Sequence, residues 1–371
     1  MSSKNKVLIT FLGNLNYDTR CNNLYNTLKV NGYEVKFLGF DWLTKDFEPI
    51  EGDVTIHKLH KGFLSLSFYL KFAWHIKFCL MSSRASIIFA EDIYTLPFAV
   101  IFGKLKRVKV FYDSRELYGH LAGLKGKKAK QGFWRIVEKL FIKKVDHIIT
   151  TGKLDSDFLI KKYKVDDPIL LRNLPRYYKP EKEYNLRSLF RINHNQKILL
   201  YQGVIHKGRG LHPTFKALKE VQNCVLVIIG DGEFEDYYRN LAKKMGMNEQ
   251  VIFAGKINQD EILSYTKTAD IGLSIIENMS LSYYYALPNK LFEYIIAEIP
   301  VVVSNLPQMK EIVEKYEVGK VVDLDNPDEL VNTIKQLIED EGLYNKFKEN
   351  CRTASQELNW ENEVKNLLEK L

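Results

Sequence analysis

The sequence predicts an α/β protein made of two Rossmann-like, doubly wound domains. The first observation is length: 371 residues are more than one ordinary core needs and suit two domains. The second is composition: 46% hydrophobic residues can bury a large core, and 27% charged residues can solvate its surface. The third is that short apolar runs alternate with helix-like stretches in two successive blocks.

The first block contains apolar runs that end in turn residues. They are rich in β-branched and aromatic residues on both faces, which is typical of buried parallel strands. A helix is predicted over 20–33, where Leu24, Leu28 and Val30 form an apolar stripe and Asn31–Gly32 is a stop signal. The predicted strands are 7–13, 34–40, 86–92, 108–113 and 145–152.

The second block repeats this alternation after residue 195. The boundary is predicted between Leu171 and Asn195, a stretch with two prolines, clustered charges and no clean period. The predicted strands are 197–203, 224–232, 251–255, 271–276, 301–305 and 319–325, and the predicted helices are 213–221, 233–246, 259–268 and 289–298.

The charge is unevenly distributed along the chain. The formal net charge is +8, with +12 on residues 1–175 and −4 on the remainder. An anionic surface or substrate facing the N-terminal half would explain this, and so would a generally lysine-rich soluble protein. The four cysteines are far apart and form no CxxC, which argues against a zinc site or a disulfide framework and favours a reducing compartment.

No export or membrane-spanning segment is predicted. The apolar run at the start of the chain is too short for a secretory signal. No stretch reaches the roughly 18 uncharged apolar residues of a spanning helix, since the longest candidate, 62–82, is interrupted by Lys71, His75 and Lys77.

Functional residues are expected in the loops after the strands, because ligands of open parallel sheets bind beyond the carboxyl ends of the strands. Gly13 follows the first strand and allows backbone to approach a ligand, although an ordinary turn would look the same. Asp113, Arg115 and Glu116 follow a buried strand, where they form either a polar cleft or a structural ion pair.

The loop 201–211 is the first candidate phosphate site. Gly203 ends a strand, and Lys207 and Arg209 alternate with Gly208 and Gly210 ahead of a helix. Glycines with cationic side chains at a helix start favour phosphate, and the fork of an arginine can hold two phosphate oxygens. A solvated basic turn is the alternative. The Gly230–Gly232 turn after the next strand is weak evidence for a nucleotide site by itself.

The segment 283–304 is the second candidate. Pro288 lies at a predicted helix start with Asn289 as the cap, and Lys290 and Glu293 share one face three residues apart. Lys290 could meet a phosphate and Glu293 could accept hydrogen bonds from ribose hydroxyls. A simple ion pair between the two is the alternative.

With these residues assembled, the chain resembles the family-4 glycosyltransferases of the GT-B fold, of the type that assembles polysaccharide and lipopolysaccharide. The resemblance runs along nearly the whole chain. It is carried, in family order, by NYDTR, AEDIYTLPFAV, VFYDSRELY, YQGVIHKGRGL, VIIGDGEFE, VIFAGKI, ADIGLS, LPNKLFEYIIAEIPVVVSNLP and NWENEV.

The resemblance implies sugar transfer from a nucleotide-diphosphate donor, usually with retention and without a metal or other cofactor, at a cleft between the domains. It divides the chain into an N-terminal acceptor-binding domain (1–175), a C-terminal nucleotide-sugar-binding domain (176–355) and a C-terminal helix (356–371) expected to pack back on the first domain. Residues and resemblance together assign a catalytic group of Arg209, Lys290 and Glu293; a donor-binding group of Gly203, Lys207, Gly230, Gly232, Gly255, Tyr285, Leu287, Pro288 and Asn289; and an acceptor-side group of Gly13, Asp18, Arg20, Asp92, Asp113, Arg115 and Glu116.

The sequence departs from the family pattern at four positions. Tyr285 replaces the glutamate that engages the donor sugar, and Val204 replaces an arginine beside the phosphates. Arg115 replaces a histidine of the YDxHEL motif, and a permanently charged group is no acid or base. Glu298 replaces a turn glycine. A nucleotide-sugar-binding protein without transferase activity, or another GT-B enzyme such as a sugar-nucleotide 2-epimerase, therefore remains an alternative.

The N-terminal half also suggests a membrane partner. Lysines 125, 127, 128 and 130 precede an apolar stripe with further lysines around it, a pattern that predicts a basic amphipathic helix. We expect residues 120–144 to meet an anionic membrane surface, with aromatic anchors from 62–78, and the protein to be cytoplasmic and peripheral on the inner face. Two ordinary helices packed on the sheet are the alternative. No nucleic-acid-binding module is recognised.

Overall fold

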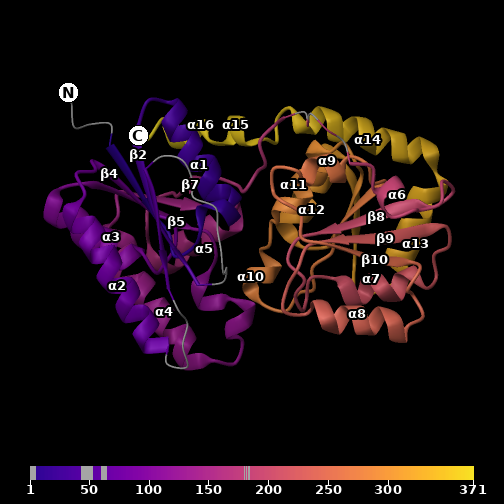
Figure 1. Cartoon of the computed structure of the whole chain (residues 1–371), viewed down its shortest axis with the longest axis horizontal. Coiled ribbons are helices and arrows are strands. Elements are labelled where there is room, and N and C mark those ends of the chain that lie inside the picture. Colours follow the sequence, from indigo (N-terminus) through magenta and orange to yellow (C-terminus); the bar gives the residue numbers. More distant parts are fainter. Residues whose placement is uncertain (1–5, 43–52, 60–64, 179, 181, 183) are drawn as a thin grey trace. The chain divides into compact units, whose positions relative to one another are not determined.

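The structure is a computed structural model that describes residues 6–42, 53–59, 65–178, 180, 182 and 184–371 (Figure 1). Residues 62–64 of the predicted anchor segment and residues 179, 181 and 183 of the predicted boundary lie outside the described residues. The chain divides into two compact units, Met1–Arg172 with Glu369–Leu371, and Asn173–Leu368. Each unit is built around its own parallel sheet.

Unit 1 contains a seven-stranded sheet in the order β3-β2-β1-β4-β5-β6-β7. Every pairing is parallel, as between β1 and β2, where Ile9 lies beside Phe37. The strands are β1 (Lys6–Thr10), β2 (Glu34–Asp41), β3 (Val54–Lys58), β4 (Ile87–Ala90), β5 (Lys109–Ser114), β6 (His147–Thr150) and β7 (Ile169–Leu170).

Helices cover both faces of this sheet. Helix α1 is capped by the side chain of Asp18, which accepts from Cys21 N, and it ends at the predicted Asn31–Gly32 stop. The helices are α1 (Thr19–Val30), α2 (Ser65–Ser82), α3 (Leu96–Lys106), α4 (Lys128–Phe141) and α5 (Lys153–Tyr163), with 3-10 turns η2 (Leu15–Tyr17), η3 (Tyr118–His120), η4 (Ala122–Leu124) and η5 (Ile142–Lys144).

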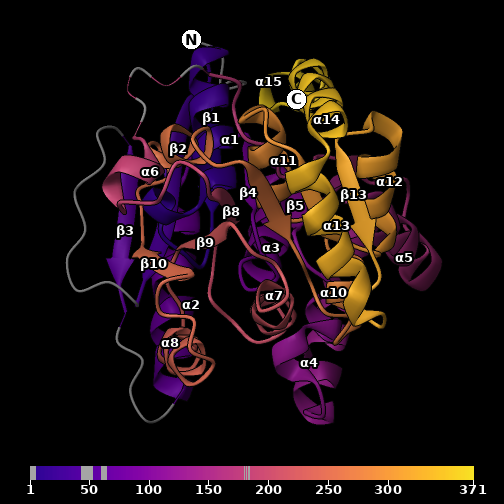
Figure 2. The same cartoon turned by 90° about the vertical axis from the view of Figure 1, so that its right-hand side faces the viewer.

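Unit 2 contains a six-stranded parallel sheet in the order β10-β9-β8-β11-β12-β13. Figures 1 and 2 show α7 and α8 on one face and α11 on the other, where Figure 1 also shows α9. Its core gathers apolar side chains from the strands and from α7 and α13, such as Leu226, Phe215 and Ile334. The strands are β8 (Lys197–Gln202), β9 (Cys224–Ile229), β10 (Val251–Gly255), β11 (Ile271–Ser274), β12 (Val301–Ser304) and β13 (Gly319–Val322).

The helices of unit 2 follow the strands in alternation. The predicted helix over 356–371 consists of two short helices, each anchored by its own buried side chain, Trp360 and Leu367. The helices are α6 (Leu186–Leu189), α7 (Leu211–Leu218), α8 (Glu235–Lys244), α9 (Ile262–Thr266), α10 (Leu281–Tyr284), α11 (Asn289–Ile296), α12 (Pro307–Tyr316), α13 (Pro327–Glu339), α14 (Glu341–Ser355), α15 (Trp360–Glu363) and α16 (Lys365–Leu368).

The predicted fold class is confirmed, and each predicted strand is present with ends shifted by at most three residues. The prediction missed β3 and β7. Both are edge strands, β7 has two residues, and β3 has no buried residue, so neither shows the continuous apolar run of a central strand. The strand order reverses beside β1 and β4 in unit 1 and beside β8 and β11 in unit 2, which marks the carboxyl ends of these strands as ligand positions.

Candidate functional site

At the carboxyl ends of β8, β9 and β10 in unit 2, glycines expose main-chain atoms without side chains. Gly203 N donates to the carbonyl of Ile229 at 2.9 Å, and Gly230 N donates to the carbonyl of Gly255 at 2.8 Å. Gly230 has a φ of +143°, and a Cβ atom there would clash with the Gly203 carbonyl oxygen. A side chain is therefore excluded at this position, and any ligand beyond the strands would face main chain.

The loop between β8 and α7 presents one arginine. Gly210 is the N-cap of α7 with a φ of +80°, and a Cβ atom there would clash with the carbonyl of Ile275. The guanidinium of Arg209 lies 4.7 Å from the ring centroid of Tyr283. Lys207, the other predicted cation of the loop, has an exposed side chain, and its carbonyl accepts from the Tyr283 hydroxyl at 3.4 Å.

Helix α11 begins at Asn289, and its N-cap is Pro288, whose ring supplies no capping hydrogen bond. The predicted cap at Asn289 is therefore wrong by one residue. Pro288 holds the extended backbone that an N-cap needs (φ −77°, ψ 146°), so Asn289 enters the first turn. At the other end, Glu298 adopts a φ of +61°, the left-handed conformation for which the family pattern has glycine.

Lys290 is a buried cation in the first turn of α11. Its side chain is 7% exposed, and its Nζ atom lies 3.7 Å from the ring centroid of Tyr201 on β8. Among the described residues this Nζ atom has no hydrogen-bond partner. Burial, and then the charge of Arg209, hold the pKa of Lys290 well below its usual value, against the opposite effect of Glu293. A second cation thus sits near Arg209 with its donors unused.

Glu293 lies one turn further along α11. Its Oε1 accepts from Gln259 Nε2 at 3.0 Å and its Oε2 accepts from Gln202 Nε2. Burial raises its pKa, and the two amide hydrogen bonds act in the opposite direction. Glu293 is thus oriented by amides, and in the described part of the chain no ion pair joins it to Lys290.

The remaining predicted donor residues surround this helix start. Tyr285 is the C-cap of α10; its carbonyl accepts from Gln308 Nε2 at 2.5 Å, and its ring centroid lies 5.8 Å from that of Tyr284. Leu287 is half-buried in the turn before Pro288. Gly232 approaches the backbone of Ile205.

A cavity of about 720 Å³ lies at the carboxyl ends of β11, β12 and β13. Its charged lining is mostly acidic, with Glu220, Glu277, Asp323, Asp325 and Asp328 against one lysine and one histidine. A diphosphate would be repelled by this lining. The cluster of Arg209, Lys290 and Glu293 is therefore the better candidate for an anionic ligand.

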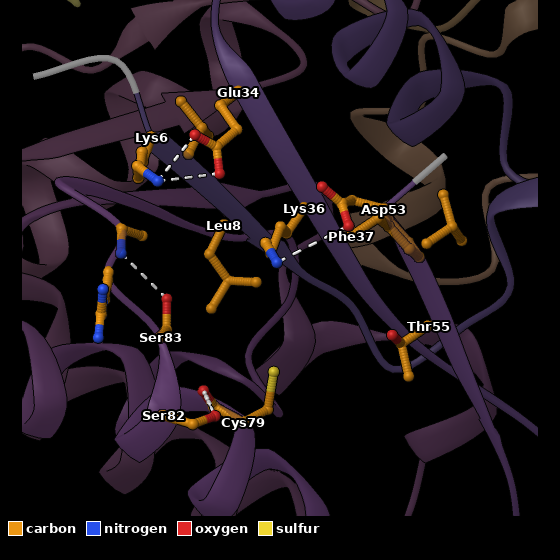
Figure 3. Close-up of a pocket in the computed structure, with 14 residues that line it drawn as sticks. Lys6, Leu8, Glu34, Lys36, Phe37, Asp53, Thr55, Cys79, Ser82 and Ser83 are labelled. Carbon is orange, nitrogen blue, oxygen red and sulfur yellow. Dashed lines mark hydrogen bonds and ion pairs between the residues drawn. The ribbon is translucent and has the colours of Figure 1, made fainter. Parts of the chain in front are cut away.

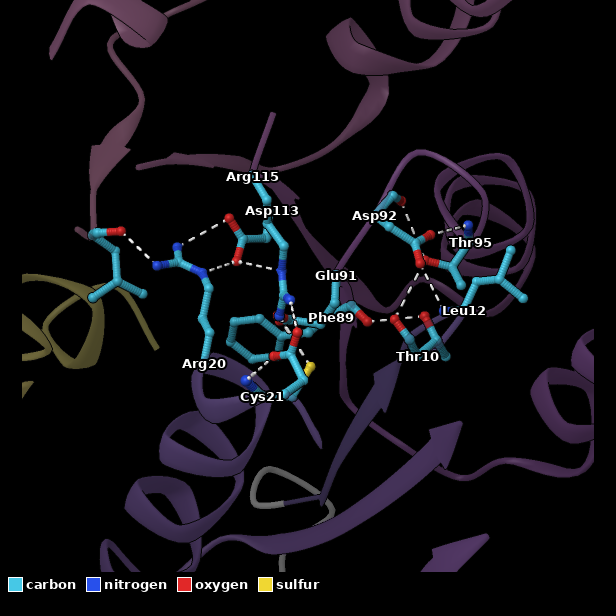
Figure 4. A network of polar contacts seen from close by, with 12 residues as sticks. Thr10, Leu12, Arg20, Cys21, Phe89, Glu91, Asp92, Thr95, Asp113 and Arg115 are labelled. Atoms are coloured by element: carbon cyan, nitrogen blue, oxygen red, sulfur yellow. Dashed lines mark hydrogen bonds and ion pairs between the residues drawn. The ribbon is translucent and has the colours of Figure 1, made fainter. Parts of the chain in front are cut away.

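A buried ion network occupies the corresponding edge of unit 1 (Figure 4). Arg20 Nε lies 2.5 Å from Asp113 Oδ2, its Nη2 donates to Asp113 Oδ1 at 3.0 Å, and its Nη1 donates to the carbonyl of Leu171 at 2.7 Å. Both charged side chains are only 2% exposed. Arg20 and Asp113 are therefore held together, and Asp113 Oδ2 also lies 3.5 Å from Arg115 Nε.

Arg115 extends the network. Its Nη1 donates to Asp18 Oδ2 at 2.7 Å and its Nη2 to Glu91 Oε2 at 2.5 Å, and its guanidinium lies 4.6 Å from the centroid of the Phe11 ring. Burial would raise the pKa of Asp18, but Arg115 and the Cys21 amide lower it below its usual value. Burial raises the pKa of Glu91 to about 7 despite the arginine.

The other acceptor-side predictions lie around this network. Asp92 accepts from Leu12 N at 2.6 Å and from Thr95 N at 2.7 Å, and burial raises its pKa. The carbonyl of Gly13 accepts from Phe40 N at 2.9 Å. Glu116 is exposed.

Another cavity, of about 450 Å³, lies at the opposite edge of the unit 1 sheet, where β1, β2 and β3 begin (Figure 3). Four of its five charged lining residues are paired, Lys6 with Glu34 at 2.8 Å and Lys36 with Asp53 at 3.7 Å, and the fifth is Arg84. It lies away from the carboxyl ends of the strands, so we do not assign the function to it.

Sequence reasoning missed Glu91, Gln202 and Gln259. Glu91 directly precedes the predicted Asp92 at the end of a buried strand, and Gln202 is a polar residue just before Gly203, so both had a signal. Gln259 had none, because only the tertiary structure brings it to Glu293.

Comparisons with known proteins agree with this fold. Residues 185–354 match the family described as glycosyl transferases group 1. The α-monoglucosyldiacylglycerol synthase of Streptococcus pneumoniae is 26% identical over 229 residues, which cover 58% of this chain and 50% of that protein. The chain spans about half the length of the curated relatives it matches.

Two solved structures share the fold along almost the whole chain. Sucrose-phosphate synthase from Thermosynechococcus elongatus has a TM-score of 0.79 at 16% identity, and Anabaena HepE has a TM-score of 0.75 at 15% identity. Each comparison covers 98% of both chains. At such identities the likeness establishes the fold and leaves the substrate open.

Proposed function

We propose that this chain moves a sugar from a nucleotide-diphosphate donor to a glycan or lipid-linked acceptor. It is a glycosyltransferase of the GT-B fold, and its residues 185–354 match the family of glycosyl transferases group 1. The observation that carries the proposal is Lys290. A buried ammonium without a partner is costly unless a ligand completes its hydrogen bonds. Its neighbour Arg209 favours a ligand with more than one negative charge.

A diphosphate fits these two cations, and a ribose fits Glu293. The Glu293 carboxylate is fixed by Gln202 and Gln259, so it is preorganised to accept a hydroxyl. A related fold supports this reading, because the Anabaena HepE structure contains UDP and glucose. In our proposal Gly203, Gly230 and Gly255 provide the bare backbone beside the nucleotide.

Stabilisation of the leaving group is the main catalytic effect that we propose. The bond between the sugar C1 and the diphosphate oxygen breaks, and negative charge develops on that oxygen. Arg209 and Lys290 would offset this charge in a partly dehydrated site, which makes the electrostatic stabilisation strong. We propose that transfer proceeds with retention and needs no metal, and we assign no nucleophile from the protein.

Donor binding is the first test. A panel of nucleotide sugars, nucleoside diphosphates and inorganic pyrophosphate is screened by thermal shift, because a ligand of the native state raises its melting temperature. The proposal requires a nucleotide-sugar hit that Arg209→Ala weakens, while exchange of the exposed Lys243 for alanine leaves it unchanged. No stabilisation by any member of the panel would overturn it.

Product analysis then separates the enzyme classes. Sugar transfer predicts release of nucleoside diphosphate that increases with acceptor. A 2-epimerase would convert the sugar without an acceptor, and a binding protein would show neither reaction.

The proposal for the partners of unit 1 is less specific. We propose a cytoplasmic, peripheral protein whose residues 120–144 meet an anionic membrane surface, where a lipid-linked acceptor would be found. The basic character of that segment supports it, since lysines attract anionic lipid.

A further inference from the structure

Two tyrosine rings lie against the two cations of the candidate donor site. The Nζ atom of Lys290 lies 3.7 Å from the ring centroid of Tyr201, near the end of β8. The guanidinium carbon of Arg209 lies 4.7 Å from the ring centroid of Tyr283 in α10. Tyr201 is only 2% exposed and Tyr283 only 7%, so water competes little for these ring contacts.

Contacts with the main chain hold each ring in place. The Tyr201 hydroxyl donates to the carbonyl of Val204 at 2.8 Å, and the Tyr283 hydroxyl donates to the carbonyl of Lys207 at 3.4 Å. The Tyr283 ring also packs closely on Gly208, where a Cβ atom would lie 2.9 Å from the ring atom Cε2. Because the main chain uses both hydroxyls, it is the ring faces that the two tyrosines offer to the cations.

A ring face holds a cation in a different way from a carboxylate. The attraction of the ring acts on the charge as a whole, whereas a carboxylate accepts the N–H donors themselves. Arg20 in unit 1 shows the second case, because Asp113 and the carbonyl of Leu171 accept from its Nε, Nη1 and Nη2 atoms. Lys290 shows the first case, since its Nζ atom makes no hydrogen bond in the described part of the chain. A cation held by a ring can therefore offer its donors to an anion without first breaking an ion pair.

We propose that Tyr201 and Tyr283 are positioning residues of the donor site, and that their ring faces hold Lys290 and Arg209 in place for the diphosphate. The inference rests on the proposed function, because it assumes that these two cations bind a diphosphate. The rings restrict two long side chains in the free protein, so less conformational freedom is lost when the ligand binds. The ring of Tyr201 also favours the charged form of Lys290, which is the form that attracts a diphosphate.

Removal of a ring is the direct test. In calorimetric titrations of the full chain with inorganic pyrophosphate, Tyr201→Leu and Tyr283→Leu are each expected to bind about tenfold more weakly than wild type. Tyr201→Phe and Tyr283→Phe keep the ring, and each should bind within about twofold of wild type. Tyr344→Leu is the matched control, because the ring centroid of Tyr344 in α14 lies 5.1 Å from the Nζ atom of Lys197, at the opposite end of β8.

Two further measurements separate a positioning role from a structural one. Trifluorinated phenylalanine in place of Tyr201 or Tyr283 keeps the ring but weakens the negative potential of its face, so pyrophosphate should bind more weakly than to the corresponding phenylalanine variant. Tyr201→Leu should also lower the pH above which pyrophosphate binding declines. The reason is that the charged form of Lys290 loses its ring, while the charges that act on it, Arg209 and Glu293, are unchanged. Tyr201→Phe should leave this pH unchanged.

The outcomes distinguish this inference from the proposed function. If wild type binds neither pyrophosphate nor any nucleoside diphosphate, the proposed function fails and the inference fails with it. If wild type binds pyrophosphate and both leucine variants bind it equally well, or if fluorination of the rings has no effect, only the inference is overturned. Should a leucine variant fail to fold, as circular dichroism would show, the comparison of fluorinated with ordinary phenylalanine decides.

Discussion

Exchange of Lys290 for methionine is expected to make the protein more stable and its donor site weaker. The native ammonium is buried and lacks a hydrogen-bond partner among the described residues, and it has a favourable ring contact with Tyr201. An unsatisfied buried polar group costs about 1–3 kcal/mol, and a dehydrated cation–π contact returns about 2 kcal/mol at best. The pKa of Lys290 is held below its usual value, so the cost of burial exceeds the favourable contacts.

Methionine has a similar length and keeps a contact with the aromatic ring. We therefore expect a net stabilisation of about 1 kcal/mol, or an increase of about 2–4 °C in melting temperature for a domain of this size. The sign of the pH dependence follows from the pKa. Because the unfolded chain binds a proton to Lys290 more tightly than the native chain, wild-type stability rises with pH from the native pKa of Lys290 up to its usual value. The advantage of the methionine variant should shrink over that interval.

Ligand binding should change in the opposite direction. Loss of one charge-assisted contact to a diphosphate costs about 1.5–3 kcal/mol, which corresponds to about a tenfold to hundredfold weaker affinity. Calorimetric titration with inorganic pyrophosphate and with the best nucleoside diphosphate measures this, and differential scanning calorimetry measures stability. Lys243→Met on the exposed surface of α8 is the control. A variant that melts below wild type, or that binds diphosphate equally well, would refute the reasoning.

Three further predictions follow from the same contacts. Arg209→Ala should lower the transfer rate by about a hundredfold while the chain stays folded, measured as nucleoside diphosphate release with circular dichroism as the check; turnover near wild type would remove its role. Diphosphate affinity should fall as pH rises, because the bound anion raises the pKa of Lys290 and binding therefore takes up a proton. Calorimetric titrations in buffers of different ionisation enthalpy measure this proton uptake. Lys290→Met should abolish the uptake. Arg20→Ala should destabilise unit 1 by about 3 kcal/mol, because it removes the two short hydrogen bonds of the buried Asp113 and leaves only the 3.5 Å contact with Arg115 Nε. Urea unfolding measures the loss, and a loss below about 1 kcal/mol would contradict the picture of a buried pair.

Much of the fold was predictable because its signals are local. The run 224–229 is apolar on both faces, and only a strand covered on both sides suits such a run. Asn31–Gly32 ended the first helix as predicted, because glycine takes the left-handed conformation at no steric cost. Edge strand β3 was missed because its neighbour in the sheet, and not its own composition, makes it a strand.

The candidate site was only partly predictable. The sequence indicated Arg209, Lys290 and Glu293 from their loops, and the structure places Lys290 near Arg209 and orients Glu293 through Gln259. Whether the donors of a lysine are used depends on its surroundings in three dimensions. No motif could therefore predict that the Nζ atom of Lys290 has no hydrogen-bond partner in the described part of the chain.

Pattern alone determined the alternation of strands and helices, the two parallel sheets, and the amphipathic character of residues 125–144. Tertiary structure decided which side of α4 faces the sheet, and it chose the side with Glu138 because two tyrosine hydroxyls satisfy that carboxylate there. Periodicity gives the angle between apolar and polar side chains around a helix, but it contains no information on where the rest of the protein lies. The direction of a helix face is fixed by contacts between residues far apart in the chain.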